Sequence, residues 1–361
     1  MVKISVVIPV YNAEEFLLES MNSLLNQTFE DFELICVNDG SKDNSLNILN
    51  DFAKKDNRVK VFNQENAGCG AARNKALNEA KGDYIYFFDP DDYILSDAFE
   101  KLYENAINTQ SDIVLFKIAK FRDGESVDYS SPGFNFDDEF PESFDFNNKS
   151  FQYKDVKRHV LNSSFAPWTK LYKKEFLDSY DDFRFPTGLA FDDVPFHVMA
   201  MLRASKISFI PDYLYHYRLS NPNSVNNTSS NGIYIMDIVD IVEDFLKQNN
   251  YYNEFYNEFY KFKIEQILYY LISSNSQDYY EKAKTELLKV KQEYFENPEH
   301  EEGFIKKYML NKYNAVIESD TFTECKLSFE ILELKRKNKR LKKENKKLKK
   351  QLAVSDLVLI F

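Results

Sequence analysis

The sequence predicts an α/β protein with a mostly parallel central sheet flanked by helices, followed by a helical extension and a short coiled coil. Between residues 4 and 116, short apolar runs alternate with helix-like stretches, which is the rhythm of a doubly wound sheet. Residues 232–295 show a helical apolar period, and residues 321–361 carry a heptad pattern. At 361 residues the chain is long enough to bury a large core.

Four apolar runs in the first stretch are predicted to be strands, with helices between them. Residues 4–8 are rich in β-branched side chains and are followed by Pro9, which is typical of a strand end. Asp43 or Ser45 is suited to cap the second helix. The other strands are expected at residues 32–37, 59–62 and 84–88, and the helices at 14–25, from about 45 onward and at 71–80.

Composition indicates a globular protein of a reducing compartment. The chain is 43% hydrophobic and 29% charged. Its three cysteines are widely spaced and odd in number, so neither a disulfide framework nor a zinc knuckle is expected. No segment reaches the roughly 18 consecutive apolar residues that span a bilayer, and the N-terminus is more typical of a strand than of a signal peptide. We therefore expect a cytoplasmic protein.

The net charge of −12 is unevenly distributed. Residues 335–350 carry eleven Lys or Arg and one Glu, a local charge of +10, so the rest of the chain is strongly acidic. Residues 123–150 are acidic, rich in Ser and Phe and poor in aliphatic residues, which predicts a loop or insertion. The acidic body is not expected to attract nucleic acid or anionic lipid.

The basic tail carries apolar and amide residues in alternating steps of four and three. This spacing predicts the a/d seam of a parallel two-stranded coiled coil and hence a homodimer through residues 327–352, although a single solvated basic helix stays an alternative. The lysines are interspersed through the heptads rather than preceding them, which is unlike a DNA-binding basic zipper. The basic face and the apolar residues 352–361 also suggest peripheral contact with an anionic membrane. The seam consists of Leu327, Ile331, Leu334, Asn338, Leu341, Asn345, Leu348 and Leu352.

Carboxylates crowd the end of the fourth predicted strand. Asp89, Asp91 and Asp92 follow the apolar run 84–88 directly, and Asp39 follows the second strand. Carboxyl ends of parallel strands lie at one edge of a sheet, where ligands bind, so these side chains are expected to meet. A D-x-D pair supplies half of a site for Mg²⁺ or Mn²⁺, which fills its other positions with phosphate oxygens and water. The alternatives are an Asx-turn for Asp39 and a solvated loop for the others.

Three motifs in the first third of the chain, SVVIPVYNAEEF…VNDGS, ENAGCGAARNKAL and GDYIYFFDPDD, resemble in order and spacing the family 2 glycosyltransferases. The resemblance is close over residues 3–116 and looser to about residue 220. It implies the GT-A fold and an inverting transfer of sugar from a nucleotide sugar, in the synthesis of cell-surface polysaccharide or glycolipid. The match at Asp39 implies UDP, since a carboxylate there can accept from the uracil N3–H.

The resemblance also assigns roles to individual residues. Arg73 is expected to pair with Asp39 or with the donor, and Pro90 departs from the small residue usual in the D-x-D. Mn²⁺ or Mg²⁺ would be bound by Asp91, Asp89 and His216. The implied nucleotide-sugar contacts are Pro9, Tyr11, Glu14, Asp39, Gly68, Arg73, Asn74, Asp89 and Arg218.

Two later motifs resemble the acceptor side of the same family. PWTKLYKKEF implies acceptor-side roles for Trp168 and Lys170, and GLAFDDVPF implies one for Asp192. Asp193 falls at the catalytic base, which takes the proton of the acceptor hydroxyl. Two departures from the family pattern are Thr169 for Asn and Asp192 for Glu. From the residues alone, an acidic pair at a helix N-terminus is the alternative.

Four segments are expected: residues 1–116 and 117–225 as the donor-binding and acceptor-binding halves of the GT-A domain, 226–320 as the helical extension and 321–361 as the coiled coil. A nicotinamide dehydrogenase is excluded because no G-x-G-x-x-G follows the first strand. A nucleotidyltransferase and a catalytically inactive nucleotide-sugar-binding scaffold stay as alternatives. The combined presence of Asp39, Asp89, Asp91 and Asp193 argues against the scaffold.

Overall fold

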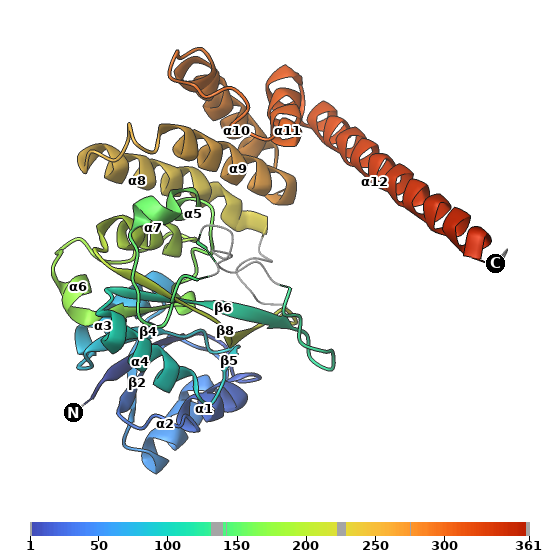
Figure 1. Ribbon diagram of the computed structural model, residues 1–361. Coiled ribbons are helices and arrows are strands. Elements are labelled where there is room, and N and C mark those ends of the chain that lie inside the picture. Colours follow the sequence, from blue (N-terminus) through green and yellow to red (C-terminus); the bar gives the residue numbers. More distant parts are fainter. Residues whose placement is uncertain (1, 131–139, 142, 222–228, 275, 359–361) are drawn as a thin grey trace. The chain divides into compact units, whose positions relative to one another are not determined.

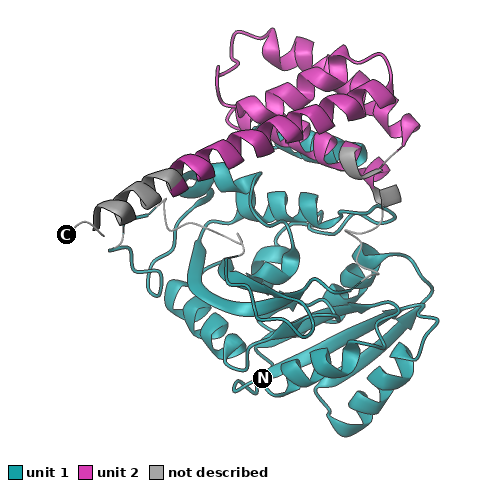
Figure 2. Ribbon diagram, turned by 90° about the vertical axis from the view of Figure 1, so that its right-hand side faces the viewer, with its two compact units in different colours: residues 1–228, 236–252 teal, residues 229–235, 253–361 magenta. Residues whose placement is uncertain are grey.

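The computed structural model describes residues 2–130, 140–141, 143–221, 229–274 and 276–358. The chain divides into two compact units, each described here by itself (Figure 2). Unit 1 comprises residues 1–228 and 236–252, and unit 2 comprises residues 229–235 and 253–361. Both halves of the predicted GT-A domain, residues 1–116 and 117–225, lie in unit 1. The segment boundaries drawn from the sequence stay predictions.

Unit 1 alternates strands and helices as the sequence predicts (Figure 1). Its elements in chain order are β1 (Ile4–Val10), α1 (Leu17–Leu25), β2 (Phe32–Asp39), α2 (Ser45–Lys55), β3 (Val59–Gln64), α3 (Cys69–Glu79), β4 (Tyr84–Phe87), β5 (Tyr93–Ile94), α4 (Ala98–Thr109), β6 (Ile113–Phe121), η1 (Tyr153–Val156), α5 (Lys157–Val160), η2 (Pro167–Thr169), β7 (Lys170–Lys173), α6 (Lys174–Asp178), α7 (Asp193–Arg203), β8 (Ile207–Arg218) and most of α8 (Ile235–Gln248).

Within the described residues the sheet has eight strands in the order β3-β2-β1-β4-β7-β6-β8-β5. The strands β3, β2, β1 and β4 are parallel, whereas β7 runs antiparallel to both of its neighbours. The remaining pairs are parallel β6–β8 and antiparallel β5–β8. The sheet is therefore mixed, with its parallel half formed by the N-terminal residues.

The expected strand end at Pro9 is wrong. β1 continues to Val10, and Pro9 lies opposite Val37 of β2. β4 pairs with β1 only as far as Val7. Beyond Val7, β1 pairs with β2 but no longer with β4. The missing N–H of Pro9 therefore costs no hydrogen bond to β4.

Helices cover both faces of the parallel half, which explains why β1 and β2 are buried along their whole length. On one face, Val6 and Ile8 share a core with Leu17 of α1 and Phe99 of α4. On the other face, Phe87 of β4 packs edge-on against aromatic rings that include Phe196 of α7, with ring centroids 5.6 Å apart. The predicted loop at 123–150 contains no helix or sheet strand among its described residues.

Unit 2 is helical, as predicted, and aromatic side chains fill its interior. Phe255 and Phe259 are fully buried, and the rings of Tyr260 and Tyr294 stack at 4.9 Å. None of the described helices is both long enough and apolar enough to cross a bilayer. The side chains of residues 351–361 lie outside the described part of the chain, so the predicted membrane contact stays a prediction. The elements are η4 (Ser229–Tyr234), α9 (Tyr256–Ser274), α10 (Gln277–Val290), the π-helical η5 (Lys291–Phe295), α11 (Lys307–Glu318) and α12 (Phe322–Val358).

Candidate active site

The predicted donor-binding carboxylates leave the sheet at the same edge. Asp39 is the last residue of β2, and Asp89 comes two residues after β4. Both strands run parallel to β1, which lies between them. The amide of Phe88 donates to the carbonyl of Val7 at 3.0 Å and holds this chain exit against β1. The carboxyl ends of β2 and β4 therefore open on one side of the sheet, where open α/β sheets bind ligands.

Asp39 organises the loop that leads into α3. Its Oδ1 accepts from the Gln64 side chain and from the Ala67 amide, both at 2.8 Å, and its Oδ2 accepts from the Gly68 amide at 2.9 Å. Gly68 makes this turn with φ +90°, a conformation that favours glycine. These partners lie far ahead in the chain rather than in the Asn38–Ser41 turn, so the Asx-turn alternative is not what the structure shows.

The loop after β1 is tied to the loop after β2. The Glu14 side chain accepts from the Asn44 amide at 2.7 Å, and the Glu14 amide donates to Asp43 at 3.0 Å. Tyr11, at the tip of this loop, is 51% exposed, whereas Pro9 is built into β1. Of these predicted donor contacts, Tyr11 and Glu14 are exposed.

Arg73 of α3 joins the D-x-D to the acidic pair that begins α7. Its guanidinium donates to Asp89 Oδ1 at 3.1 Å and to Asp192 Oδ1 at 3.2 Å, while the Arg73 side chain is only 7% exposed. The expected pairing of Arg73 with Asp39 is wrong, because Asp39 is already engaged by the amides in front of α3. Asn74 also has an internal role: its amide makes two hydrogen bonds with the backbone of Phe185, at 2.8 and 2.9 Å.

The Asp192 side chain is buried and packs closely against Gly70. Burial raises its pKa to about 7, and the positive charge of Arg73 opposes that rise. Its Oδ2 has no hydrogen-bond partner among the described residues. A Cβ added at Gly70 would collide with this oxygen and would lie 2.5 Å from the carbonyl oxygen of Pro186. The sequence analysis predicted Gly68 as a site residue but did not predict Gly70, which lies two residues further along the same motif.

Asp193, the predicted base, is the first residue of α7 and is partly buried. Burial raises the pKa of its carboxyl, with Arg73 and Lys170 opposing the rise. Phe191, two residues before Asp193, has φ +64°, which is strained for a bulky residue and typical of functional sites. The acidic pair lies at a helix N-terminus and also within the carboxylate cluster, and its catalytic role stays a prediction.

The predicted acceptor-side residues from η2 and β7 are buried. Lys170 is fully buried and donates to the carbonyls of Ser164 and Ala166 at 3.1 and 2.9 Å. Burial lowers the pKa of this lysine well below its usual value. The Trp168 ring stacks on the Tyr215 ring, with centroids 4.5 Å apart. Lys170 lies close enough to Asp193 to influence its carboxyl, and an acceptor contact of Lys170 or Trp168 stays a prediction.

Hydrogen bonds to β8 hold the residues at the end of the D-x-D and directly after it, Asp91 and Asp92. Asp92 is fully buried, accepting from the Tyr215 hydroxyl at 2.5 Å and the Arg218 amide at 2.7 Å. Asp92 is therefore a structural residue that joins the loop after β4 to β8. The carboxylate of Asp91 accepts from the Asn221 side chain at 2.7 Å.

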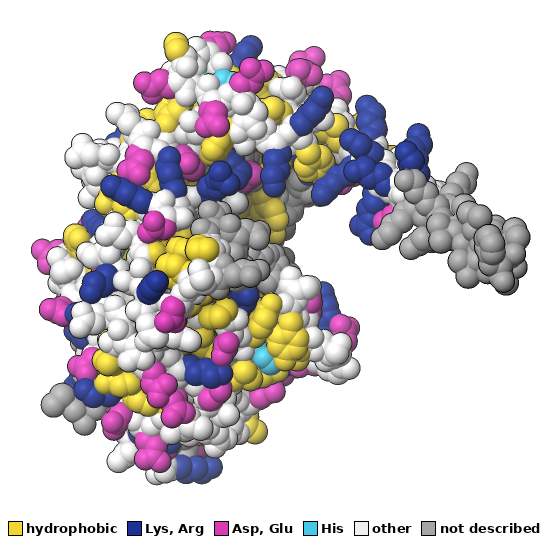
Figure 3. Space-filling view, in the orientation of Figure 1, with side chains coloured by type: hydrophobic (Ala, Val, Ile, Leu, Met, Phe, Trp, Pro, Cys, Tyr) yellow, Lys and Arg dark blue, Asp and Glu magenta, His cyan; other side chains and the backbone are white. Residues whose placement is uncertain are grey.

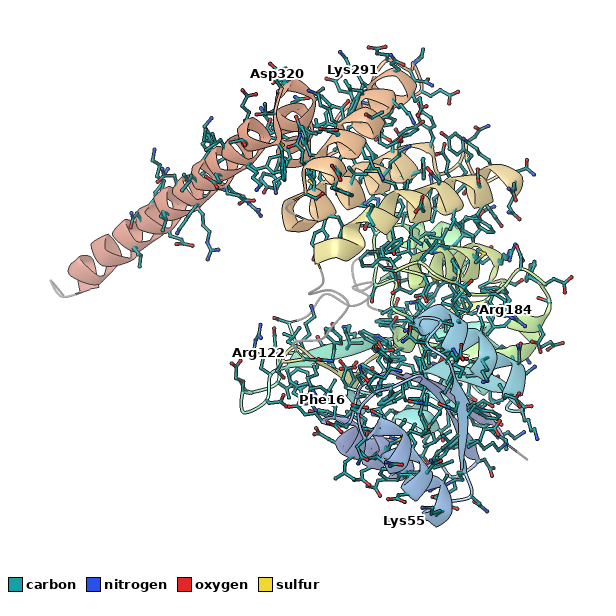
Figure 4. All side chains as sticks on the ribbon, turned by 180° about the vertical axis from the view of Figure 1, so that it is seen from behind. Phe16, Lys55, Arg122, Arg184, Lys291 and Asp320 are labelled. Carbon is teal, nitrogen blue, oxygen red and sulfur yellow. The ribbon has the colours of Figure 1, made fainter. Side chains whose placement is uncertain are left out.

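Arg218, a predicted donor contact, is engaged by the protein itself. Its Nε donates to the Asp91 carbonyl at 2.7 Å, and its other nitrogens pair with Glu19 and Asp123. Its guanidinium also lies over the ring of Phe16, 5.1 Å from the centroid. Phe16 is labelled in Figure 4. No sequence motif pointed to Glu19 or Asp123, and only the fold brings them together.

The residues predicted to bind a cation have the right chemistry for one. The His216 ring is buried, its Nδ1 lies 2.5 Å from the Tyr93 hydroxyl, and its Nε2 has no hydrogen-bond partner among the described residues. Asp89 and Asp91 provide the carboxylates that Mg²⁺ and Mn²⁺ prefer. No group of three or more His, Cys, Asp or Glu side chains in the described part of the chain is arranged as a metal cage. The described residues therefore do not bring Asp89, Asp91 and His216 together as a three-ligand site, and cation binding stays a prediction.

Comparison with known proteins shows similarity to glycosyltransferases. The family model described as "Glycosyl transferase family 2" matches residues 5–180. Glycosyltransferase GlyG of Streptococcus pneumoniae serotype 4 is 35% identical over 251 residues, which cover 66% of this chain and 77% of GlyG. The poly(ribitol-phosphate) beta-glucosyltransferase of Bacillus spizizenii is 40% identical over 220 residues, which cover 60% of this chain and 32% of that protein.

Other relatives are also matched over part of their length. The chain spans 30% of GlyA of Streptococcus pneumoniae serotype 4 and 62% of EpsJ of Bacillus subtilis. A crystal structure of S. aureus TarS 1–349 in complex with UDP-GlcNAc superposes with a TM-score of 0.56 at 21% identity, covering 91% of this chain and 90% of TarS 1–349. This likeness shows that the chain has the predicted GT-A-like fold with a helical C-terminal region.

Proposed function

Because the chain is a family 2 glycosyltransferase, we propose that it transfers a sugar from a UDP-sugar to an acceptor hydroxyl with inversion of the anomeric configuration. The observation that carries the proposal is Arg73, whose guanidinium joins Asp89 to Asp192. The carboxylates assigned to the donor and the acidic pair assigned to the acceptor thereby belong to one cluster. Nothing in this arrangement favours a nucleotidyltransferase.

In the proposed reaction Asp193 is the general base. It takes the proton of the acceptor hydroxyl while that oxygen attacks the anomeric carbon from the face opposite the diphosphate. The new C–O bond forms as the bond to the diphosphate breaks, and the electron pair leaves with UDP. The raised pKa of Asp193 suits this role, because a base is most effective when its pKa lies near the working pH.

The donor is proposed to be a UDP-sugar for two reasons. Asp39 has the carboxylate that the resemblance assigns to the uracil, and it is buried at the sheet edge. The fold neighbour TarS is crystallised with UDP-GlcNAc. Asp91 and Asp89 are the residues that would hold Mn²⁺ or Mg²⁺, and a cation there would supply positive charge for the leaving diphosphate.

The acceptor is proposed to be a saccharide, polyol phosphate or lipid-linked chain of the cell surface. The proposal draws on the relative named poly(ribitol-phosphate) beta-glucosyltransferase. We place the reaction in the cytoplasm, at the inner face of the membrane, since the free thiols of Cys36, Cys69 and Cys325 suit a reducing compartment. Fractionation of cells that express the tagged protein would test this location.

The test of the proposed function is Asp193→Asn, with the exposed Asp181→Asn as the matched control. The Asn variant should still bind the UDP-sugar in a thermal-shift assay with Mn²⁺, but its turnover should fall by about 10²–10⁴-fold because a general base is lost. NMR of the product should show the inverted anomer. If Asp193→Asn keeps the turnover of the control, or the anomer is retained, the proposed reaction is wrong.

A further inference from the structure

Helix α12 has two apolar faces, and its own unit covers only one of them. Phe322, Cys325 and Phe329 are buried, with 8%, 0% and 8% of their surface exposed. Further along this covered face, Glu333 accepts from the Tyr308 hydroxyl of α11. The face ends at Arg336, whose guanidinium lies 4.7 Å from the Tyr308 ring centroid. The described residues 337–346 are all exposed.

The second face carries large apolar side chains that nothing in the described chain covers. At 3.6 residues per turn, these residues lie roughly 100–200° around the helix from Phe329, away from the covered face. So many exposed aliphatic side chains on one line are unusual for a monomer and mark an interaction surface. The exposed residues are Leu327 (53%), Ile331 (49%), Leu334 (63%), Leu341 (46%) and Leu348 (55%).

The residue types on this exposed face of α12, the free face, indicate which kind of partner it binds. The leucines recur every seven residues, and the positions between them are taken by Ile331, Asn338 and Asn345. An apolar stripe of two positions in seven is the narrow seam of a coiled coil, whereas a helix lying on a membrane needs a broader apolar face. Asparagine at the a position satisfies its amide against the same residue of a parallel, in-register partner. The free face therefore fits a second copy of itself.

Charges beside the seam include both attractive and repulsive pairs. In a parallel pair, each g residue faces the e residue five positions later in the partner. Glu330 would face Lys335, an attractive pair, and Glu344 occupies another g position. Lys337 would face Lys342, a repulsive pair, and the surrounding helix is strongly basic (Figure 3). Since like charges dominate overall, salt should strengthen this association by screening.

We propose that α12 pairs through its face from Leu327 to Leu348 with the same face of a second copy, as a parallel two-stranded coiled coil. The seam would be formed by residues of α12 alone. It would also place two basic tails side by side. The proposal does not depend on the reaction, because its readouts are mass and cross-linking rather than turnover.

Analytical ultracentrifugation of the full chain tests the association. We expect a species of twice the 42.6 kDa chain mass, with a larger dimer fraction at high than at low salt. Leu334→Gln with Leu341→Gln should be monomeric at every salt concentration, while the control Lys339→Gln with Lys343→Gln, on exposed positions outside the seam, should dimerise at least as well as the natural chain. Unchanged circular dichroism in both variants would show that the fold is intact.

Cross-linking tests the register. In a background with the exposed Cys69 replaced by Ser, Leu341→Cys should form an intermolecular disulfide on mild oxidation, and Lys343→Cys should not. The proposal is overturned by a monomer at high salt, by a trimer, or by equal cross-linking at both positions. It is also overturned if the seam variant abolishes binding to phosphatidylglycerol vesicles while the natural chain stays monomeric, because the free face would then belong to a membrane.

Discussion

Replacing Asp192 with Asn should stabilise the protein at alkaline pH. Asp192 is 6% exposed, and burial raises its pKa to about 7. The same carboxyl in the unfolded chain has a pKa of about 3.9. A carboxyl whose pKa is raised on folding binds its proton more tightly in the native state, so it lowers the free energy of unfolding as the pH rises above 3.9. Asn has the shape of the neutral carboxyl and avoids this effect.

The size of the effect follows from the two pKa values, at about 1.36 kcal/mol per pH unit. Above pH 7 the ionised Asp192 destabilises the native state by about 4 kcal/mol relative to its neutral form. At pH 5 the difference has fallen to below about 2 kcal/mol, because the native carboxyl is then protonated while the unfolded one is still largely ionised. The advantage of the Asn variant should therefore grow by roughly 2–3 kcal/mol between pH 5 and pH 8.

Urea unfolding at pH 5 and pH 8, followed by circular dichroism, measures this difference. The control is Asp181→Asn, a nearby exposed position, which should change the free energy of unfolding little at either pH. The amide oxygen of the Asn variant can still accept from Arg73. If the Asn variant gains nothing between pH 5 and pH 8, or is less stable at pH 8, the ion pair with Arg73 outweighs burial and the reasoning is refuted.

Three further outcomes follow from the site. Gly70→Ala should destabilise the fold by about 1–3 kcal/mol in urea unfolding, because its Cβ would collide with Asp192; a stability equal to that of the natural chain would contradict the close packing. Asn74→Ala should lose both hydrogen bonds to the Phe185 backbone and cost about 1–3 kcal/mol, whereas an unchanged midpoint would show that water replaces them. Chelation of divalent cations should stop sugar transfer and Mn²⁺ should restore it, while turnover that survives chelation would remove the cation from the proposed reaction.

Local patterns predicted the four parallel strands β1 to β4 and the three helices between them well, because these strands are apolar runs between turn residues. The predicted ends of these strands were less accurate. Pro9 was expected to end β1, but the reach of the strand depends on where β4 stops pairing, which is a property of the assembled sheet. In the same way β2 extends through Asp39, whose carboxylate is held by amides at positions 67 and 68.

The partners of the charged residues could not be predicted from spacing. Arg73 and Asp192 are separated by 119 positions, and their contact exists only because α3 and the start of α7 meet above the end of β4. Resemblance to a family gave both residues separate roles without indicating their link. Arg218 likewise pairs with Glu19, 199 positions away and outside any motif. Contacts of this kind depend on the tertiary fold, whereas the D-x-D and the acidic pair are visible as local clusters.

The first part of α12 packs against its own unit, whereas residues 337–346 are exposed. This difference affects how the sequence of the protein can change. Among the described residues, the contacts of α12 with the rest of its unit end at Arg336. Insertions, deletions or exchanges of the tail by whole heptads would therefore leave the preceding helices intact. Related chains can then acquire different tail lengths or tail partners through changes in this stretch alone, without any alteration of the catalytic unit.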